Sequence, residues 1–194
     1  MMMDKLILLG IFAASGFAAD SMVQVAVNFP GGCPYGPVNR TITATNDATY
    51  SAACGTGGTG QATAHAEIGL LEVSASTGGS ATPAQSLASA RYADQVTLPP
   101  GEQYAIVSLL LNGSITQTSG TGSLVLTLKA GSTSSQLRFS APAGQTTTIT
   151  NQVFTTGPIF VTGKSFRYTV EIDASARGGT ASSQLTAGLF GTAQ

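Results

Sequence analysis

The sequence predicts an all-β protein, folded as a single antiparallel β-sandwich with a jelly-roll-like wrap. Three observations support this prediction. Apolar and polar residues alternate with a period of two in many segments, as in strands that bury one face. Clusters of Gly, Pro, Ser and Thr separate those segments and are typical of turns. After residue 20 there is no helical period and no change in composition, so residues 19–194 are expected to form one domain.

Residues 1–18 have the pattern of a cleavable signal peptide. Lys5 precedes an apolar run over residues 6–14, and Gly16 and Ala18 place small side chains before a cleavage site that follows Ala18. Cleavage one residue later is an alternative, and so is a buried N-terminal helix. The run is shorter than the span of about 20 residues that crosses a membrane. We therefore expect a secreted protein, extracellular or periplasmic, with no membrane anchor after cleavage.

Two cysteines predict one disulfide. Cys33 lies in the stretch FPGGCPYGPVNRTI, whose glycines and prolines prevent a regular strand, and Cys54 follows twenty-one residues later. In an exported chain such a pair predicts a disulfide bridge. On the chain-entropy model the bridge adds about 3 kcal/mol to the free energy of unfolding. Two unpaired cysteines are the alternative. A zinc site would need more ligands, and the single histidine, His65, is not near either cysteine in the sequence.

The alternating segments predict about ten short strands. We expect them, in chain order, at residues 21–29, 40–50, 61–75, 86–98, 104–112, 123–129, 135–139, 146–154, 165–177 and 182–190. The alternation changes phase near Gly69, which predicts a β-bulge there. Residues 104–112 are apolar on both faces and should form a central strand. Among the turn clusters, residues 119–123 and 178–180 are expected to separate consecutive strands.

Few residues could support catalysis. A Ser-His-Asp triad would have to use His65, which lies beside Glu67 on the polar face of its predicted strand and is expected to be solvated. The Gly-rich stretch at residues 55–61 lacks the Lys-Ser/Thr of a phosphate-binding loop and opens no helix, so a hairpin loop is expected. We therefore predict that the protein is not an enzyme and binds no cofactor.

The acidic residues are candidates for a metal site. Glu171 and Asp173 share one face of a predicted strand, and clustered oxygens of this kind can bind calcium. The other acidic residues are scattered, so we predict no metal and a structural role for this pair. Asp94 falls on the apolar face of its strand, with Arg91 on the opposite face. We expect Asp94 at a sheet edge or in a hydrogen bond.

The composition excludes some partners. Charged residues make up 9% of the chain, against about 25% in an average soluble protein. The net charge is −1, so we expect no basic surface for nucleic acid. The sequence has no tryptophan. Sugar stacking, which uses exposed aromatic rings, would therefore depend on Tyr35 and Tyr104.

The stretch ASARYADQVTL, residues 88–98, followed by PPGEQY, resembles the exported bacterial β-sandwich proteins that carry a PEP-CTERM sorting tail. Those proteins have an Ala/Ser-rich strand that ends in an Asp-x-Leu/Val-Thr-Leu-like stretch before a Gly/Pro turn. Residues 165–190 are similar to their last two strands. This sequence ends in GLFGTAQ, without the Pro-Glu-Pro motif, apolar helix and basic cluster of the tail. The resemblance implies an untethered relative with an extracellular or matrix-associated role.

The sequence therefore predicts a secreted, non-catalytic β-sandwich with a structural role at the cell surface or in the extracellular matrix. A second hypothesis is a carbohydrate-binding module whose partner is an extracellular polysaccharide. A third is a subunit that assembles by pairing edge strands, because Ala/Ser/Thr-rich strands with few charges have weak edge protection. The oligomeric state is left open.

Overall fold

The computed structural model of the chain describes residues 20–29, 33, 40–54, 57–79 and 84–193, with residues 178–193 described by their backbone only. The expected signal peptide and Tyr35 lie outside this part. The described residues form eleven strands and include no helix that could cross a membrane. The strands are β1 (Asp20–Asn28), β2 (Arg40–Ala44), β3 (Asp47–Cys54), β4 (Gly58–Glu67), β5 (Leu70–Gly78), β6 (Gln85–Thr97), β7 (Tyr104–Ala130), β8 (Thr133–Ser140), β9 (Thr146–Thr155), β10 (Ile159–Phe160) and β11 (Ser165–Ala193).

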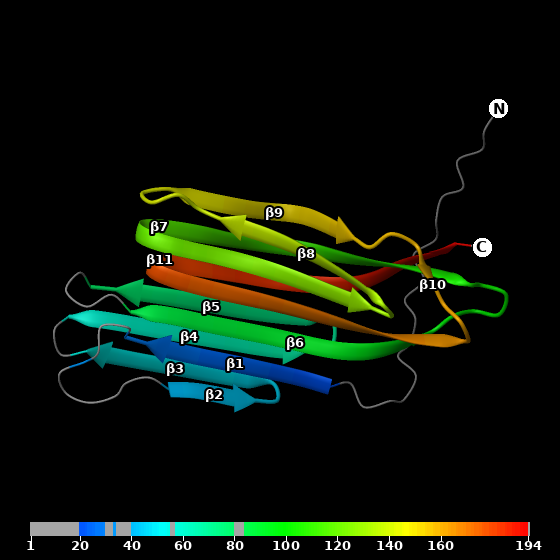
Figure 1. The fold of residues 1–194 in the computed structure, drawn as a ribbon, viewed down its shortest axis with the longest axis horizontal. Helices are drawn as coiled ribbons and strands as arrows, with labels where there is room; N and C mark the ends of the chain where they lie inside the picture. Colours follow the sequence, from blue (N-terminus) through cyan, green and yellow to red (C-terminus); the bar gives the residue numbers. More distant parts are fainter. Residues whose placement is uncertain (1–19, 30–32, 34–39, 55–56, 80–83, 194) are drawn as a thin grey trace.

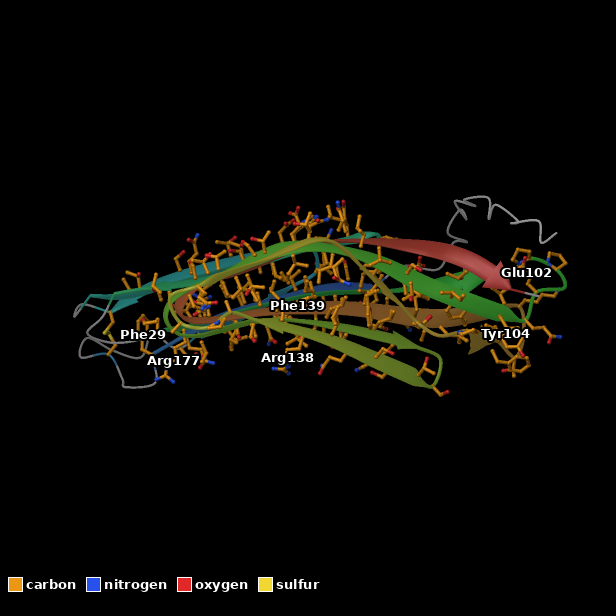
Figure 2. All side chains as sticks on the ribbon, turned by 90° about the horizontal axis from the view of Figure 1, so that it is seen from above. Phe29, Glu102, Tyr104, Arg138, Phe139 and Arg177 are labelled. Atoms are coloured by element: carbon orange, nitrogen blue, oxygen red, sulfur yellow. A yellow bond between two sulfur atoms is a disulfide. The ribbon has the colours of Figure 1, made fainter. Side chains whose placement is uncertain are left out.

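The strands form two stacked antiparallel sheets (Figures 1 and 2). Sheet 1 has the order β2-β1-β6-β11-β7-β8. Sheet 2 has the order β3-β4-β5-β11-β7-β9, and β10 extends the β9 edge. The long strands β7 and β11 contribute one half to each sheet, so they form a two-stranded ribbon that wraps from one sheet to the other. The predicted β-sandwich with a jelly-roll-like wrap is thus confirmed.

The ribbon folds at a glycine. Gly120 has a φ of 80°, which favours glycine, and a Cβ there would overlap the carbonyl oxygen of Arg177 on the paired strand. The prediction that residues 119–123 and 178–180 separate strands is wrong, because both strands bend together here. The ladder between β7 and β11 shifts register by two residues at the bend and then continues, so neither strand ends.

Two other predictions differ from the structure. Residues 40–50 do not form one strand, because the chain bends at Thr45 and Asn46 and its two halves join different sheets as β2 and β3. The bulge expected near Gly69 is a hairpin turn, in which Ile68 and Gly69 connect β4 to β5. Gly69 has a φ of 83°, as tight hairpin turns require. The alternation changes phase there because the chain reverses direction.

The core lies between the sheets and is built from alternate residues of their strands. In β11 the residues predicted to face inward, from Phe166 to Ala174, are all buried, and the residues between them are exposed or half-buried. Tyr168 packs edge to face against Tyr92 of β6, with ring centroids 6.0 Å apart, a favourable aromatic geometry. Other large, fully buried side chains are Leu71, Leu109, Leu111, Ile115, Leu124, Leu126, Leu128 and Ile172.

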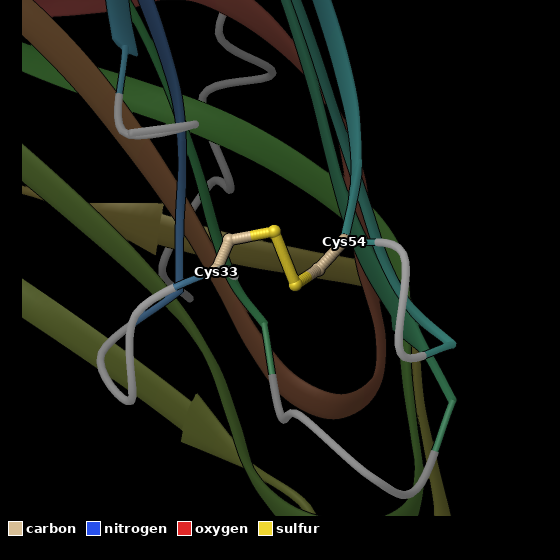
Figure 3. Close-up of a disulfide and its surroundings, with 2 residues drawn as sticks. All are labelled: Cys33 and Cys54. Carbon is tan, nitrogen blue, oxygen red and sulfur yellow. A yellow bond between two sulfur atoms is a disulfide. The ribbon is translucent and has the colours of Figure 1, made fainter. Parts of the chain in front are cut away.

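The predicted disulfide between Cys33 and Cys54 is confirmed, with Cα atoms 5.6 Å apart (Figure 3). Cys33 follows β1 of sheet 1, and Cys54 ends β3 of sheet 2. The bridge therefore joins the two sheets. Cys54 is buried with Val27, Phe29 and Ala84 in a small apolar cluster that is separate from the main core.

Candidate ligand-binding site

A cleft lies at one end of the sandwich, between the loop from β6 to β7 and the loop from β10 to β11. It has a volume of about 640 Å³ and is lined by residues 97–103 and 160–164, a size typical of small-molecule sites. We call it the end cleft. Figure 2 places Glu102 and Tyr104 at this end of the molecule, away from Phe29 and Arg177 at the other end.

Backbone hydrogen bonds within and between its two loops fix the end cleft. Pro99 to Glu102 form a turn in which the Glu102 N–H donates to the Pro99 carbonyl at 3.2 Å, and Gly101 has a φ of 90°. A type II turn favours Pro at its second position and Gly at its third, and Pro100 and Gly101 occupy these positions here. The Leu98 N–H donates to the Lys164 carbonyl at 2.7 Å. A second bond, from the Val161 N–H to the Gln103 carbonyl at 2.8 Å, also ties the two loops together.

An aromatic pair borders the end cleft. Phe160 of β10 lies opposite Tyr104 of β7 in the sheet register, so both side chains leave the sheet on the same side. Their ring centroids are 5.4 Å apart, with an angle of 59° between the planes. Phe160 lines the cleft and is 56% exposed. Tyr104 therefore supports an aromatic ring that is largely open to solvent.

Polar groups complete the end cleft. The Oε2 atom of Glu102 is buried and accepts no hydrogen bond from the described residues. A buried acceptor without a donor costs free energy, and a rotation of the Glu102 side chain, which lines the cleft, would let a ligand hydroxyl relieve that cost. The Lys164 side chain is exposed on the opposite loop and can donate hydrogen bonds. An apolar ring beside a few polar groups is an arrangement suited to binding a small polar ligand.

The predicted carboxylate pair lies elsewhere, on the outer face of sheet 1. The Ser89 hydroxyl donates to Glu171 Oε1 at 3.4 Å, and Glu171 lies opposite Arg91 in the register. Burial raises the pKa of the Asp173 carboxyl. In the part of the chain that the structure describes, no group of three or more His, Cys, Asp and Glu side chains could hold a metal ion.

His65 lies on β4 and pairs with carboxylates. Its Nδ1 atom is 2.7 Å from Asp47 Oδ1, and its Nε2 atom is 4.0 Å from Glu67 Oε2. The hydrogen bond with Asp47 raises the pKa of His65. Both ring nitrogens therefore face acidic groups, whereas a hydrolytic triad places a serine hydroxyl against one of them.

Asp94 makes a hydrogen bond, as expected. Its Oδ1 atom accepts a hydrogen bond of 2.7 Å from the Gln95 N–H. Among the described residues, β1 begins at Asp20, opposite Ala93, so the described part of β1 does not extend to Asp94. The charge is thus partly solvated although it lies on the apolar side of the strand.

Tyr104 was a candidate from the sequence, whereas Phe160 and Glu102 were not. Phe160 lies in a strand of two residues, too short to produce an alternating pattern. Only the Pro-Pro-Gly-Glu turn signalled a rigid loop at this position. β3 and β4 pair as a hairpin, as expected of the Gly-rich stretch at residues 55–61, but residues 58–61 belong to strand β4 rather than to a loop, and residues 55 and 56 lie outside the described part.

Comparisons with known proteins place the chain in no family. No family model and no curated protein matches the sequence. A solved structure of TmCBM61 in complex with β-1,4-galactotriose matches with a TM-score of 0.33 and 10% identity, over 67% of this chain and 88% of that chain.

Proposed function

We propose that this protein is an exported, non-catalytic carbohydrate-binding β-sandwich that holds a sugar in the end cleft. The observation that carries the proposal is the exposed ring of Phe160, supported by Tyr104 at the rim of a preformed cleft. An aromatic face is apolar and fits the C–H face of a sugar ring, while a few polar groups meet the hydroxyls. The end cleft offers both.

The expected binding energy is modest. Covering the exposed part of Phe160 contributes about 1 to 2 kcal/mol. A hydroxyl that donates to the Glu102 carboxylate, once this side chain has turned toward the cleft, contributes about 1.5 to 3 kcal/mol. The hydrogen bonds between the two loops reduce the ordering that binding requires. These contributions total about 2.5 to 5 kcal/mol before the entropic cost of association, so we expect weak binding with a Kd in the millimolar range.

The cellular setting that we propose is extracellular. A disulfide such as Cys33–Cys54 persists in oxidising compartments, where polysaccharides are abundant ligands. A protein that holds a matrix polysaccharide through the end cleft would be retained at the cell surface. The structural, matrix-associated role expected from the sequence would then follow from carbohydrate binding.

Edge-strand assembly has less support. Two of the four edge strands are poorly suited to such pairing: β2 has only five residues, and β9 is interrupted where Asn151 adopts a φ of 48° beside a register shift. Short edges and bulges are two ways in which proteins prevent edge-to-edge pairing. We therefore favour a binding protein over a self-assembling subunit.

The test is retention on insoluble cellulose, chitin, mannan, β-1,3-glucan and β-1,4-galactan. We expect saturable retention on at least one polymer and a loss of about tenfold or more in affinity for Phe160→Ala, because the stacking surface is removed. Ile68→Ala is the matched control, since Ile68 is a 51% exposed apolar residue in a hairpin turn outside the cleft. Its retention should equal that of the wild type.

Two results would refute the proposal. One is the absence of saturable retention on every polymer. The other is equal retention of the Phe160→Ala and wild-type proteins. A wild-type size that rises with concentration in light scattering, without polysaccharide, would instead support assembly through edge strands.

A further inference from the structure

Two apolar residues on the outer face of sheet 1 are buried although they lie outside the core. Ala26 of β1 is 6% exposed and Val125 of β7 is 8% exposed, and neither belongs to the core clusters between the sheets. Outward residues of a flat two-layer sandwich face water. Their burial indicates that this face is hollowed, and a groove of about 390 Å³ does lie over them. We call it the outer groove.

The outer groove runs across the strands. Its lining comes from five adjacent strands, β2, β1, β6, β11 and β7. In one row of the register, Ser89 of β6 lies next to Asp173 of β11, which lies next to Val125. Adjacent strands are about 4.8 Å apart, so the four steps from β2 to β7 span roughly 19 Å. The groove is therefore long enough for several linked sugar rings.

The lining combines an apolar floor with polar walls. Ala26 and Val125 form the floor, the exposed apolar side chain of Leu87 lies beside it, and hydroxyl, amide and carboxyl groups make up most of the remaining lining. Ser123 and Ser175 are hydrogen-bonded to each other through their hydroxyls at 2.9 Å, and each keeps further bonding capacity. The lining contains one charged side chain, Asp173. A carboxylate repels acidic polymers and accepts hydrogen bonds from neutral hydroxyls.

We propose that the outer groove is a second carbohydrate-binding site, which takes an extended, neutral glycan lying across the strands of sheet 1. Sugar C–H groups would pack on Ala26 and Val125, while hydroxyls would bond to Asp173 and the serines. This site shares its ligand class with the proposed function but none of its residues. One molecule with both sites occupied holds two glycan chains.

Titration calorimetry with cellohexaose, laminarihexaose and mannohexaose tests the proposal. For the hexasaccharide that binds, we expect two sites in the wild type and one in Phe160→Ala. Asp173→Ala should also leave one site, because the lost carboxylate weakens the outer groove by about tenfold or more. The double variant should bind none. Glu67→Ala, which removes an exposed carboxylate from sheet 2, is the control and should keep both sites.

The outcomes separate the two proposals. If Phe160→Ala abolishes all binding and Asp173→Ala changes nothing, the outer groove is refuted and the end cleft stands. If Asp173→Ala abolishes all binding and Phe160→Ala changes nothing, the end cleft is refuted and the outer groove stands. If no hexasaccharide binds the wild type, both sites are refuted for neutral glycans. Asp173→Asn, which preserves the shape of the side chain and one acceptor oxygen, should bind more tightly than Asp173→Ala, and the end-cleft site that Asp173→Ala retains shows that this variant is folded.

Discussion

Removing the Cys33–Cys54 bridge should lower the free energy of unfolding by about 3 kcal/mol. The bridge closes a loop in the unfolded chain and so reduces the conformational entropy of that state. The two cysteines are 21 residues apart. In the folded state the bridge joins β1 of sheet 1 to the end of β3 in sheet 2. Cys33→Ala/Cys54→Ala is the suitable variant, because Cys54 is 2% exposed and alanine places no new polar group in its apolar cluster.

Urea unfolding followed by circular dichroism measures the effect. We expect a lower midpoint in the double variant and a fall in the melting temperature of about 6 to 12 °C. Wild-type protein reduced with dithiothreitol should behave like the double variant, whereas the reductant should not change the double variant itself. A loss of stability below about 0.5 kcal/mol, within the range of neutral surface substitutions, would refute the reasoning that the bridge constrains the unfolded chain.

Three further predictions follow from burial and close contacts. Burial raises the pKa of Tyr168 to about 12 and raises that of Tyr92 as well, so both should stay un-ionised at pH 11 by ultraviolet titration. Because their pKa values are raised on folding, stability should fall as pH rises above 10. The pKa of His65, measured by NMR, should lie above its ordinary value and fall in Asp47→Asn. The His65–Asp47 pair stabilises the fold fully below the pKa that His65 has in the unfolded chain, and this stabilisation is lost as the pH rises through the pKa of His65 in the folded protein. Gly60→Ala should destabilise the fold by about 1 to 3 kcal/mol in urea unfolding, because a Cβ at this position would overlap the Val27 side chain of β1. An unchanged urea midpoint would contradict this packing.

Much of the candidate site depends on contacts between distant segments. Tyr104 could be identified from the sequence, because aromatic residues are few. Phe160 could not, since its role comes from pairing with Tyr104 across 56 residues. The outer groove was also hidden: Ser89 and Asp173 belong to different predicted strands, and only the register brings them together. Sequence patterns report which side of a strand a residue faces, but not which strand lies beside it.

The sequence by itself determined the all-β class, the inward face of strands such as β11, and the pairing of the only two cysteines. These features depend on local alternation and on composition, which the chain carries residue by residue. The tertiary structure decided that β7 and β11 continue through the Gly-rich bend as one folded ribbon. It also decided where the end cleft and the outer groove form. Strand order and loop packing are set by contacts between residues far apart in the chain, because each strand can bury its apolar face against more than one partner.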